Sequence, residues 1–195
     1  TRVMSQMALF SSDTDDPSVS DVAGLLACNG QALPMAGGTR VSVVVDAQWR
    51  ARALAQELEL IGLAVEIARS EEGSPVVRTM PTPLLDDLRR LWSSGAVKAV
   101  PPGWTPSPRA LRQWTIAAGR RDGDKYLLGL DVHAPDTHPA LATALMRVGV
   151  APILTGARGG LPAVRIAGKR RVTRFVEMVG APPDEPDALA DWPIV

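Results

Sequence analysis

Side chains that commonly bind metals are scarce in this sequence. It has a single cysteine, Cys28, and only two histidines, His133 and His138. One cysteine excludes a disulfide framework and a cysteine-based zinc site, and two histidines leave little for a histidine-based one. We therefore expect no metal and no other cofactor, and we expect Cys28 to be a buried, unreactive thiol.

Long apolar runs and familiar catalytic motifs are missing as well. No run approaches the roughly 18 to 20 apolar residues that a bilayer-spanning helix needs. Near the N-terminus, Ala8-Leu9-Phe10 is followed at once by Ser11-Ser12-Asp13, so no segment has the pattern of a signal peptide. A P-loop, a dinucleotide-binding fingerprint and a Ser-His-Asp set are also absent. The sequence predicts a soluble, cytoplasmic protein with no membrane partner.

Net charge is zero, with 21 basic and 21 acidic residues, but its distribution is uneven. Residues 104–180 contain twelve basic and five acidic residues, whereas residues 22–103 contain eight of each. Both ends are acidic, with a net charge of −3 over residues 1–21 and −4 over residues 181–195. A basic body with acidic ends is compatible with binding a polyanion, and equally with a solvated surface that binds nothing.

The two halves of the chain resemble each other at a separation of 87 residues. The segment Pro75-Val76-Val77-Arg78 aligns with Pro162-Ala163-Val164-Arg165, and Leu58–Ile67 aligns with Leu145–Leu154. This ungapped match predicts an internal duplication. A chance match between two segments rich in alanine and valine is the alternative.

Each half predicts the same order of elements: helix, strand, helix, hairpin, helix. In the first half these are residues 19–27, 40–46, 47–61, 64–70 with 75–79, and 83–92. In the second half they are residues 108–121, 126–133, 137–148, 151–157 with 161–167, and 169–179. The sequence thus predicts an α+β fold made of two α-β-α-β-β-α repeats.

Composition divides the chain into five parts. We expect a flexible acidic N-terminal segment, two structured halves joined by a proline-rich linker, and an acidic C-terminal tail. Their bounds are residues 1–18, 19–100, 101–108, 109–181 and 182–195.

The end of the first predicted helix carries a motif. Val22-Ala23-Gly24-Leu25-Leu26-Ala27-Cys28-Asn29-Gly30 resembles the LAGLIDADG motif of the homing endonucleases. A weaker copy spans residues 115–123, where Asp122-Gly123 is the clear match. Each copy precedes the strand, helix, hairpin and helix order that this family uses. The resemblance implies a pseudo-twofold domain whose two sheets form a saddle, with the concave face lying in the major groove of duplex DNA.

In active members of that family, the penultimate motif position of each half carries an acidic residue that binds a divalent metal. The corresponding positions are Asn29 and Asp122. Asn29 is a poor replacement for a carboxylate, because a hard cation prefers charged oxygen ligands. The sequence is therefore similar to a degenerate form of the family, as in the actinobacterial WhiA sporulation regulators, whose homing-endonuclease-like domain binds rather than cuts. Asp122 alternatively fits a solvated residue in a turn.

Several basic residues are candidates for binding nucleic acid. Arg78 and Arg165 occupy equivalent strand positions, opposite their apolar neighbours. Basic residues also open the last predicted helix, where they oppose the helix dipole unless an anion is bound there. For each candidate the alternative is simple exposure to solvent. The candidates are Arg40, Arg78, Arg158, Arg165, Lys169, Arg170 and Arg171.

The sequence leaves three functions open. The first is a non-catalytic nucleic-acid-binding protein, with duplex DNA as its partner and a regulatory role. The second is a protein-interaction module that has lost DNA binding and uses the acidic C-terminal tail as a docking segment, on a partner or on its own basic face. The third is a residual metal-dependent nuclease or nickase.

Overall fold

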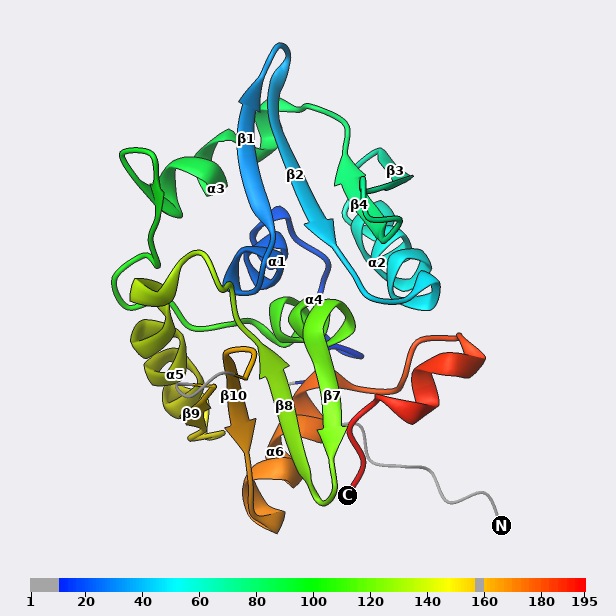
Figure 1. Cartoon of the computed structure of the whole chain (residues 1–195), viewed down its shortest axis with the longest axis vertical. Helices are drawn as coiled ribbons and strands as arrows, with labels where there is room; N and C mark the ends of the chain where they lie inside the picture. The colour runs from blue at the N-terminus through cyan, green and yellow to red at the C-terminus, as the bar shows by residue number, and fades with distance from the viewer. Residues whose placement is uncertain (1–10, 157–159) are drawn as a thin grey trace.

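The computed structural model describes residues 11–156 and 160–195. Two similar halves, each a four-stranded antiparallel sheet with helices, lie on either side of two central helices, α1 and α4 (Figure 1). This α+β architecture and its duplication confirm the fold class predicted from the sequence. Within the described residues, every helix is too short or too polar to cross a lipid bilayer.

Each half follows the order helix, two strands, helix, two strands, helix. The first half consists of α1 (Ala23–Ala27), β1 (Gln31–Met35), β2 (Gly38–Val44), α2 (Gln48–Leu60), β3 (Val65–Arg69), β4 (Pro75–Thr79) and α3 (Asp86–Leu91). The second half consists of α4 (Pro108–Ala118), β7 (Gly119–Asp122), β8 (Lys125–Gly129), α5 (His138–Arg147), β9 (Ile153–Thr155), β10 (Ala163–Ile166) and α6 (Lys169–Val179). Short 3-10 turns precede α1, α3 and α5 at Val19–Val22, Pro83–Leu85 and Pro135–Thr137.

The predicted repeat lacked one strand in each half, namely β1 and β7. Residues 119–121 were expected to continue a helix, but Gly119 has an extended backbone and ends α4. Arg120 then pairs with Leu127 across the β7–β8 hairpin. Because β7 contains no apolar side chain, its sequence gives no alternating pattern, and the strand is held by its backbone pairing with β8.

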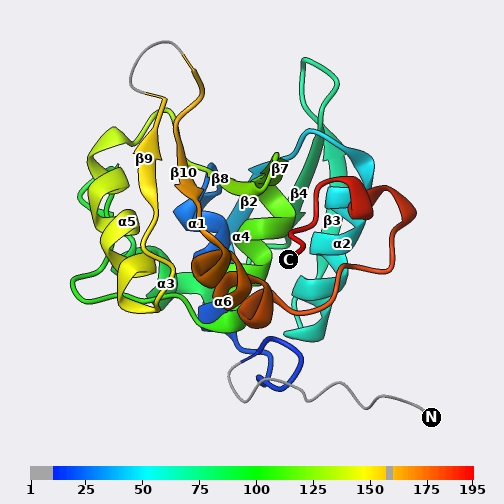
Figure 2. The same cartoon turned by 90° about the horizontal axis from the view of Figure 1, so that it is seen from below.

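Both sheets have one face covered by helices and one face uncovered. Their strand orders are β1-β2-β4-β3 and β7-β8-β10-β9. The covered faces are aliphatic, and Val41, Val77, Leu128 and Val164 are fully buried there. In Figure 2, α2 and α5 lie outside the two sheets, α1, α4 and α6 lie beneath them, and no helix covers the space between the β3–β4 and β9–β10 hairpins. The uncovered faces form the predicted saddle.

The halves meet where α1 crosses α4. A Cβ atom at Gly24 would lie 1.9 Å from the carbonyl oxygen of Ala110, so only glycine allows this approach. Leu25 and Trp114 flank the crossing within one continuous hydrophobic core. The two halves therefore share a core.

The linker between the halves contains a short hairpin, β5 (Ser93–Ser94) and β6 (Val97–Lys98), before its proline-rich part. Trp104 packs edge-on against Trp92, with ring centroids 4.8 Å apart. This contact fixes the linker against the end of the first half.

The described parts of both acidic ends pack on the body. Ser12 donates hydrogen bonds from its N–H to Met178 O and from its hydroxyl to Val179 O. At the other end, Trp192 is buried and donates from Nε1 to Gly180 O at 3.1 Å. Residues 1–10 lie outside the described part of the chain.

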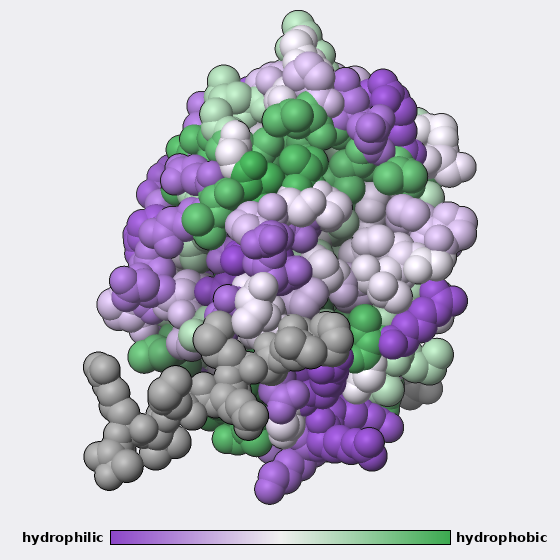
Figure 3. All heavy atoms as spheres, turned by 180° about the vertical axis from the view of Figure 1, so that it is seen from behind, coloured by the Kyte–Doolittle hydropathy of each residue, from purple (hydrophilic) through white to green (hydrophobic). Residues whose placement is uncertain are grey.

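Figure 3 shows the side of the molecule opposite the view of Figure 1. Apolar surface gathers over the upper, first half of this side, and hydrophilic surface predominates at its lower end. The α6 helix reaches this lower end in Figure 1 and begins with the exposed residues Lys169, Arg170 and Arg171.

Candidate nucleic-acid interface

Strand pairing defines which side chains share the uncovered face of each sheet, because directly opposite residues point to the same side. In the first half, Arg78 of β4 lies opposite Ser42 of β2 and Glu66 of β3. Ser42 in turn lies opposite Gln31 of β1. One row of side chains across this sheet therefore reads Glu66, Arg78, Ser42 and Gln31.

The second half has an equivalent row with different chemistry. Arg165 of β10 lies opposite Leu127 of β8 and Ile153 of β9, and Leu127 lies opposite Arg120 of β7. The row therefore reads Ile153, Arg165, Leu127 and Arg120. Compared with the first half, an aliphatic side chain replaces the carboxylate and an arginine replaces the glutamine.

These rows also correct the second copy of the motif. Because Arg165 corresponds to Arg78, Arg120 corresponds to Gln31, and Gly119 corresponds to the motif glycine Gly30. Both glycines are closely packed, since an added Cβ would lie 2.3 Å from Leu25 O at Gly30 and 2.3 Å from the Tyr126 hydroxyl at Gly119. The second copy is therefore residues 111–119 rather than 115–123.

Asp122 consequently lies far from the position predicted for it. It is the last residue of β7, pairs with Lys125 across the hairpin turn, and is exposed. The residue that precedes the second motif glycine is Ala118. The two penultimate motif positions are therefore Asn29 and Ala118, and neither carries a carboxylate.

Asn29 and Ala118 both line a pocket of about 460 Å³ between the two halves. The side chain of Asn29 donates from Nδ2 to Val44 O at 3.0 Å, so it is held by the backbone. The pocket's charged or titratable side chains are Asp46, Arg50, Arg120, Asp131 and His133. Among residues 11–156 and 160–195, no cluster of three His, Cys, Asp or Glu side chains could hold a metal ion.

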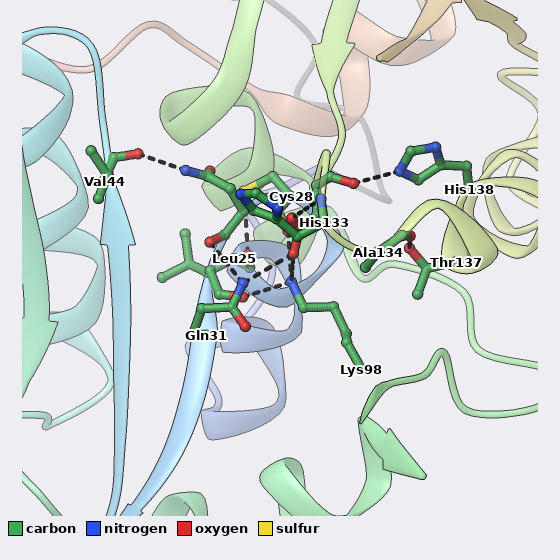
Figure 4. A network of polar contacts seen from close by, with 12 residues as sticks. Leu25, Cys28, Gln31, Val44, Lys98, His133, Ala134, Thr137 and His138 are labelled. Carbon is green, nitrogen blue, oxygen red and sulfur yellow. Dashed lines mark hydrogen bonds and ion pairs between the residues drawn. The ribbon is translucent and has the colours of Figure 1, made fainter. Parts of the chain in front are cut away.

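Lys98 reaches from β6 to the C-terminal end of α1 (Figure 4). Its Nζ donates to Cys28 O at 2.9 Å, to Gly30 O at 2.7 Å and to Asp131 Oδ2 at 2.8 Å. An ammonium group thus occupies an oxygen-lined position at the end of the first motif helix, where a cation also complements the helix dipole.

Arg50 has the equivalent position at the C-terminal end of α4. This buried guanidinium donates to Ile116 O at 2.9 Å and to Gly119 O at 2.6 Å. It also pairs with Asp46 at 2.8 Å and with Asp191 at 3.4 Å. Each motif helix therefore ends on a cationic side chain of the protein itself.

The carboxylate beside Lys98 is buried but well satisfied. Besides the lysine, Asp131 accepts hydrogen bonds from Gln31 Nε2 at 3.0 Å and from the His133 N–H at 2.9 Å. Burial by itself raises the pKa of Asp131, but these hydrogen bonds and the charge of Lys98 together lower that pKa below its ordinary value of 3.8. Asp131 is therefore ionised at neutral pH and committed to its ion pair.

On the uncovered face of the first half, the two predicted arginines share one carboxylate. Arg78 Nε lies 2.5 Å from Glu66 Oε1. Arg40 lies 3.9 Å from the same carboxylate and donates from Nε to Thr79 O at 3.1 Å. The structure thus brings Arg40 and Arg78 together, but around a shared glutamate.

In the second half the arginine on that face is unpaired. Arg165 Nε is buried and has no hydrogen-bond partner within the described part of the chain. Ile153 stands in the place of Glu66, and its aliphatic side chain cannot neutralise Arg165. Arg120 and Lys125 share this face and likewise have no carboxylate partner among the described residues. This face of the second sheet is therefore a cationic surface.

Of the remaining predicted residues, Lys169 lies beside this surface, and Arg170 and Arg171 are exposed at the start of α6. Lys169 lines a second pocket together with Lys125, which brings the start of α6 next to the β7–β8 turn. Arg158 falls on residues that the structure does not describe. Sequence reasoning missed Arg120 and Lys125, although both contribute to the basic excess of residues 104–180.

No family model and no curated protein matches the sequence. Several solved structures match the fold. The homing endonuclease I-WcaI bound to its DNA recognition sequence has a TM-score of 0.59 at 10% identity, covering 87% of this chain and 84% of that one. I-DmoI in complex with DNA and calcium has a TM-score of 0.54 at 14% identity, covering 90% of this chain and 98% of that one.

Full-length DUF199/WhiA from Thermatoga maritima has a TM-score of 0.60 at 12% identity. The match covers 83% of this chain and 54% of that protein, so the chain spans about half of its length. At these identities the likeness concerns the fold, and it agrees with the resemblance seen in the first motif. The chain therefore has the fold of the LAGLIDADG homing endonucleases and of the WhiA LAGLIDADG domain.

Proposed function

We propose that this protein is a non-catalytic DNA-binding protein, with a regulatory role, that holds duplex DNA against the uncovered faces of its two sheets. The observation that carries the proposal is the unpaired Arg165. A buried guanidinium nitrogen without a partner is costly unless a ligand satisfies it. Phosphate and guanine edges are the acceptors that arginine matches best.

The neighbouring charges support the same ligand. Arg120 and Lys125 extend the cationic surface along the uncovered face, and Lys169 continues it around the β7–β8 turn. Such a surface attracts a polyanion and places several cations within reach of successive phosphates. The fold match to a homing endonuclease bound to its DNA recognition sequence agrees with this placement.

The ends of the motif helices support the non-catalytic part of the proposal. Metal-assisted phosphodiester cleavage needs carboxylates that hold a divalent cation. Asn29 and Ala118 supply none, and the nearby Asp131 is engaged by Lys98. The oxygen atoms at the end of α1 are thus already bonded to an ammonium group.

The alternative of a docking tail for a protein partner is less well supported. Glu185 of the C-terminal segment pairs with Arg52 at 2.9 Å, and Asp191 pairs with Arg50 at 3.4 Å. This segment docks on α2 of the protein itself, and two of its four acidic side chains are paired there.

Binding of a fluorescent duplex of mixed sequence, measured between about 50 and 200 mM salt, tests the proposal. Arg165→Met should weaken binding to every sequence and reduce the salt slope by about one unit. Arg78→Met combined with Glu66→Gln is the matched control and should have a small effect, because the ion pair that it removes carries no net charge. Ile153→Glu supplies the missing carboxylate and should weaken binding without removing any cation.

Three results would contradict the proposal. The first is a failure of the full chain to bind duplex DNA at low salt. The second is an equal effect of Arg165→Met and of the double variant at Glu66 and Arg78. The third is specific cleavage of DNA by the purified protein with magnesium or manganese, which would favour the residual nuclease instead.

A further inference from the structure

Aliphatic side chains stand on the uncovered face of the first sheet. Leu33 is 50% exposed, and Met35 and Val44 are each 42% exposed. Leu33 lies opposite Arg40, and Val44 lies opposite Val76, which places them on the same face as the Arg78 row. Aliphatic side chains therefore project from the face that we propose to contact DNA.

The equivalent positions of the second half are not aliphatic. On this face, the next pair along the hairpin after Gln31 and Ser42 is Leu33 and Arg40, and the next pair after Arg120 and Leu127 is Asp122 and Lys125. The pair Leu33 and Arg40 therefore corresponds to the pair Asp122 and Lys125. By the same correspondence, Gly129 stands in the place of Val44. The saddle is thus chemically asymmetric: the first sheet carries three exposed aliphatic side chains and two arginines that share Glu66, whereas the second carries unpaired cations beside Ile153 and Leu127.

The major groove of DNA presents one apolar group, the C5 methyl of thymine. Aliphatic side chains contact that methyl, whereas arginine and lysine contact phosphates and the acceptors of guanine. Ser42, interspersed on the same face, adds a hydroxyl suited to base edges, and Gln31 adds its amide oxygen, since its amide nitrogen donates to Asp131. A surface of this mixed kind, continuous with the cationic second sheet, suits a DNA groove better than an apolar protein surface.

We infer that the first sheet recognises thymine methyl groups, so that the protein prefers an asymmetric duplex with thymines under β1–β4. This inference rests on the proposed DNA binding and adds a sequence preference to it. Leu33 and Val44 are its specificity-determining residues, and the cations of the second sheet supply binding that does not depend on sequence.

Selection from random duplexes with the full chain should enrich thymine in one half of the bound site. The selected duplex is then resynthesised with deoxyuridine in place of thymidine in that half, which removes the methyl groups and keeps every base pair. Binding should weaken by about fourfold for each contacted methyl lost, the factor that corresponds to one buried methylene-sized group. The same replacement in the other half should have a smaller effect, because Ile153 is the exposed aliphatic side chain placed on that face by its pairing with Arg165.

Two variants connect the methyl effect to this surface. Leu33→Ser combined with Val44→Ser should bind the thymidine and deoxyuridine duplexes equally while still binding DNA. Ile67→Ser is the matched control, because Ile67 is 40% exposed on the same sheet but lies opposite the buried Val77, on the other face. That variant should keep the full preference for thymidine.

The outcomes separate this inference from the proposed function. Equal binding of both duplexes by the unchanged protein overturns the inference and leaves DNA binding intact, and so does a preference that survives the double substitution of Leu33 and Val44 by serine. A selection that enriches no thymine overturns it as well. If the protein binds no duplex at all, the proposed function and the inference fall together.

Discussion

Replacing Lys98 by methionine should destabilise the protein strongly, because the ammonium group satisfies three oxygen atoms at once. Methionine retains most of the aliphatic volume and removes the charge. Asp131, which is 2% exposed, would keep its bonds from Gln31 and His133 but lose its counter-ion. The carbonyl oxygens of Cys28 and Gly30 would each lose the hydrogen bond from Lys98.

Removing one partner of a buried ion pair typically costs about 3–5 kcal/mol, because the other charge stays buried. We expect Lys98→Met to lower the free energy of unfolding by about that amount in urea titrations at pH 7. Adding Asp131→Asn removes the isolated charge and should restore about 1–3 kcal/mol. Arg90→Met, which breaks the exposed pair with Asp87, is the control and should cost less than about 1 kcal/mol.

Lowering the pH should reduce the difference in free energy of unfolding between Lys98→Met and the unchanged protein. The pKa of Asp131 is lowered in the folded protein, so its ion pair stabilises the fold above the ordinary pKa of 3.8, and this contribution is lost as the pH falls below that value. Without Lys98, burial is the largest remaining influence on Asp131, and it raises the pKa. The variant should therefore take up its proton at a higher pH than the unchanged protein. A cost of less than about 1 kcal/mol at pH 7, or one that does not change with pH, would refute this account of the network.

Three further predictions concern the core. Gly24→Ala should lower the free energy of unfolding by at least about 1–3 kcal/mol, because the new methyl group would clash with Ala110 O, and this outweighs the better helix propensity of alanine. An unchanged stability in urea would contradict the close approach of α1 and α4 at this glycine. Burial raises the pKa of the Cys28 thiol to about 11, so Cys28 should react with a disulfide reagent only after unfolding, and rapid labelling of the native protein would contradict its burial. Trp192→Ala should cost about 3–5 kcal/mol and lower the melting temperature, so deleting residues 181–195 should destabilise the fold rather than merely expose basic surface; a stable truncated protein would show that the segment is dispensable.

The repeated segments were enough to predict most of the fold. The different lengths of the β1–β2 and β7–β8 hairpins explain where the alignment of the two halves failed. The separation of 87 residues holds between β4 and β10, where Arg78 and Arg165 are equivalent. Elsewhere the correspondence shifts, because the β1–β2 hairpin extends to the pair Met35 and Gly38, beyond the last pair of β7–β8. Asp122 was placed at the end of a motif helix because Asp122-Gly123 matches the end of the motif, 93 residues after Asn29-Gly30, whereas the structurally equivalent Gly119 follows Gly30 by 89 residues.

The candidate site was likewise predictable only in part. Strand alternation was enough to place Arg78 and Arg165 on the uncovered faces, since a period of two depends only on local geometry. Their pairing was not predictable, because Glu66 and Ile153 come from neighbouring strands whose alignment depends on the whole sheet. Lys98 was missed for the same reason, since it lies 33 residues before its partner Asp131 and on a linker hairpin.

Because α1 and α4 meet backbone to backbone at Gly24 and Ala110, neither half encloses a core of its own. Two fragments made by breaking the linker between residues 101 and 107 should each be unfolded or aggregate alone, and should refold when mixed. Chain continuity would then serve mainly to hold the halves at an effective concentration in the millimolar range. Exchange of one half for that of another protein of this fold would have to preserve the small residues at the crossing, whatever surface the new half presents to DNA.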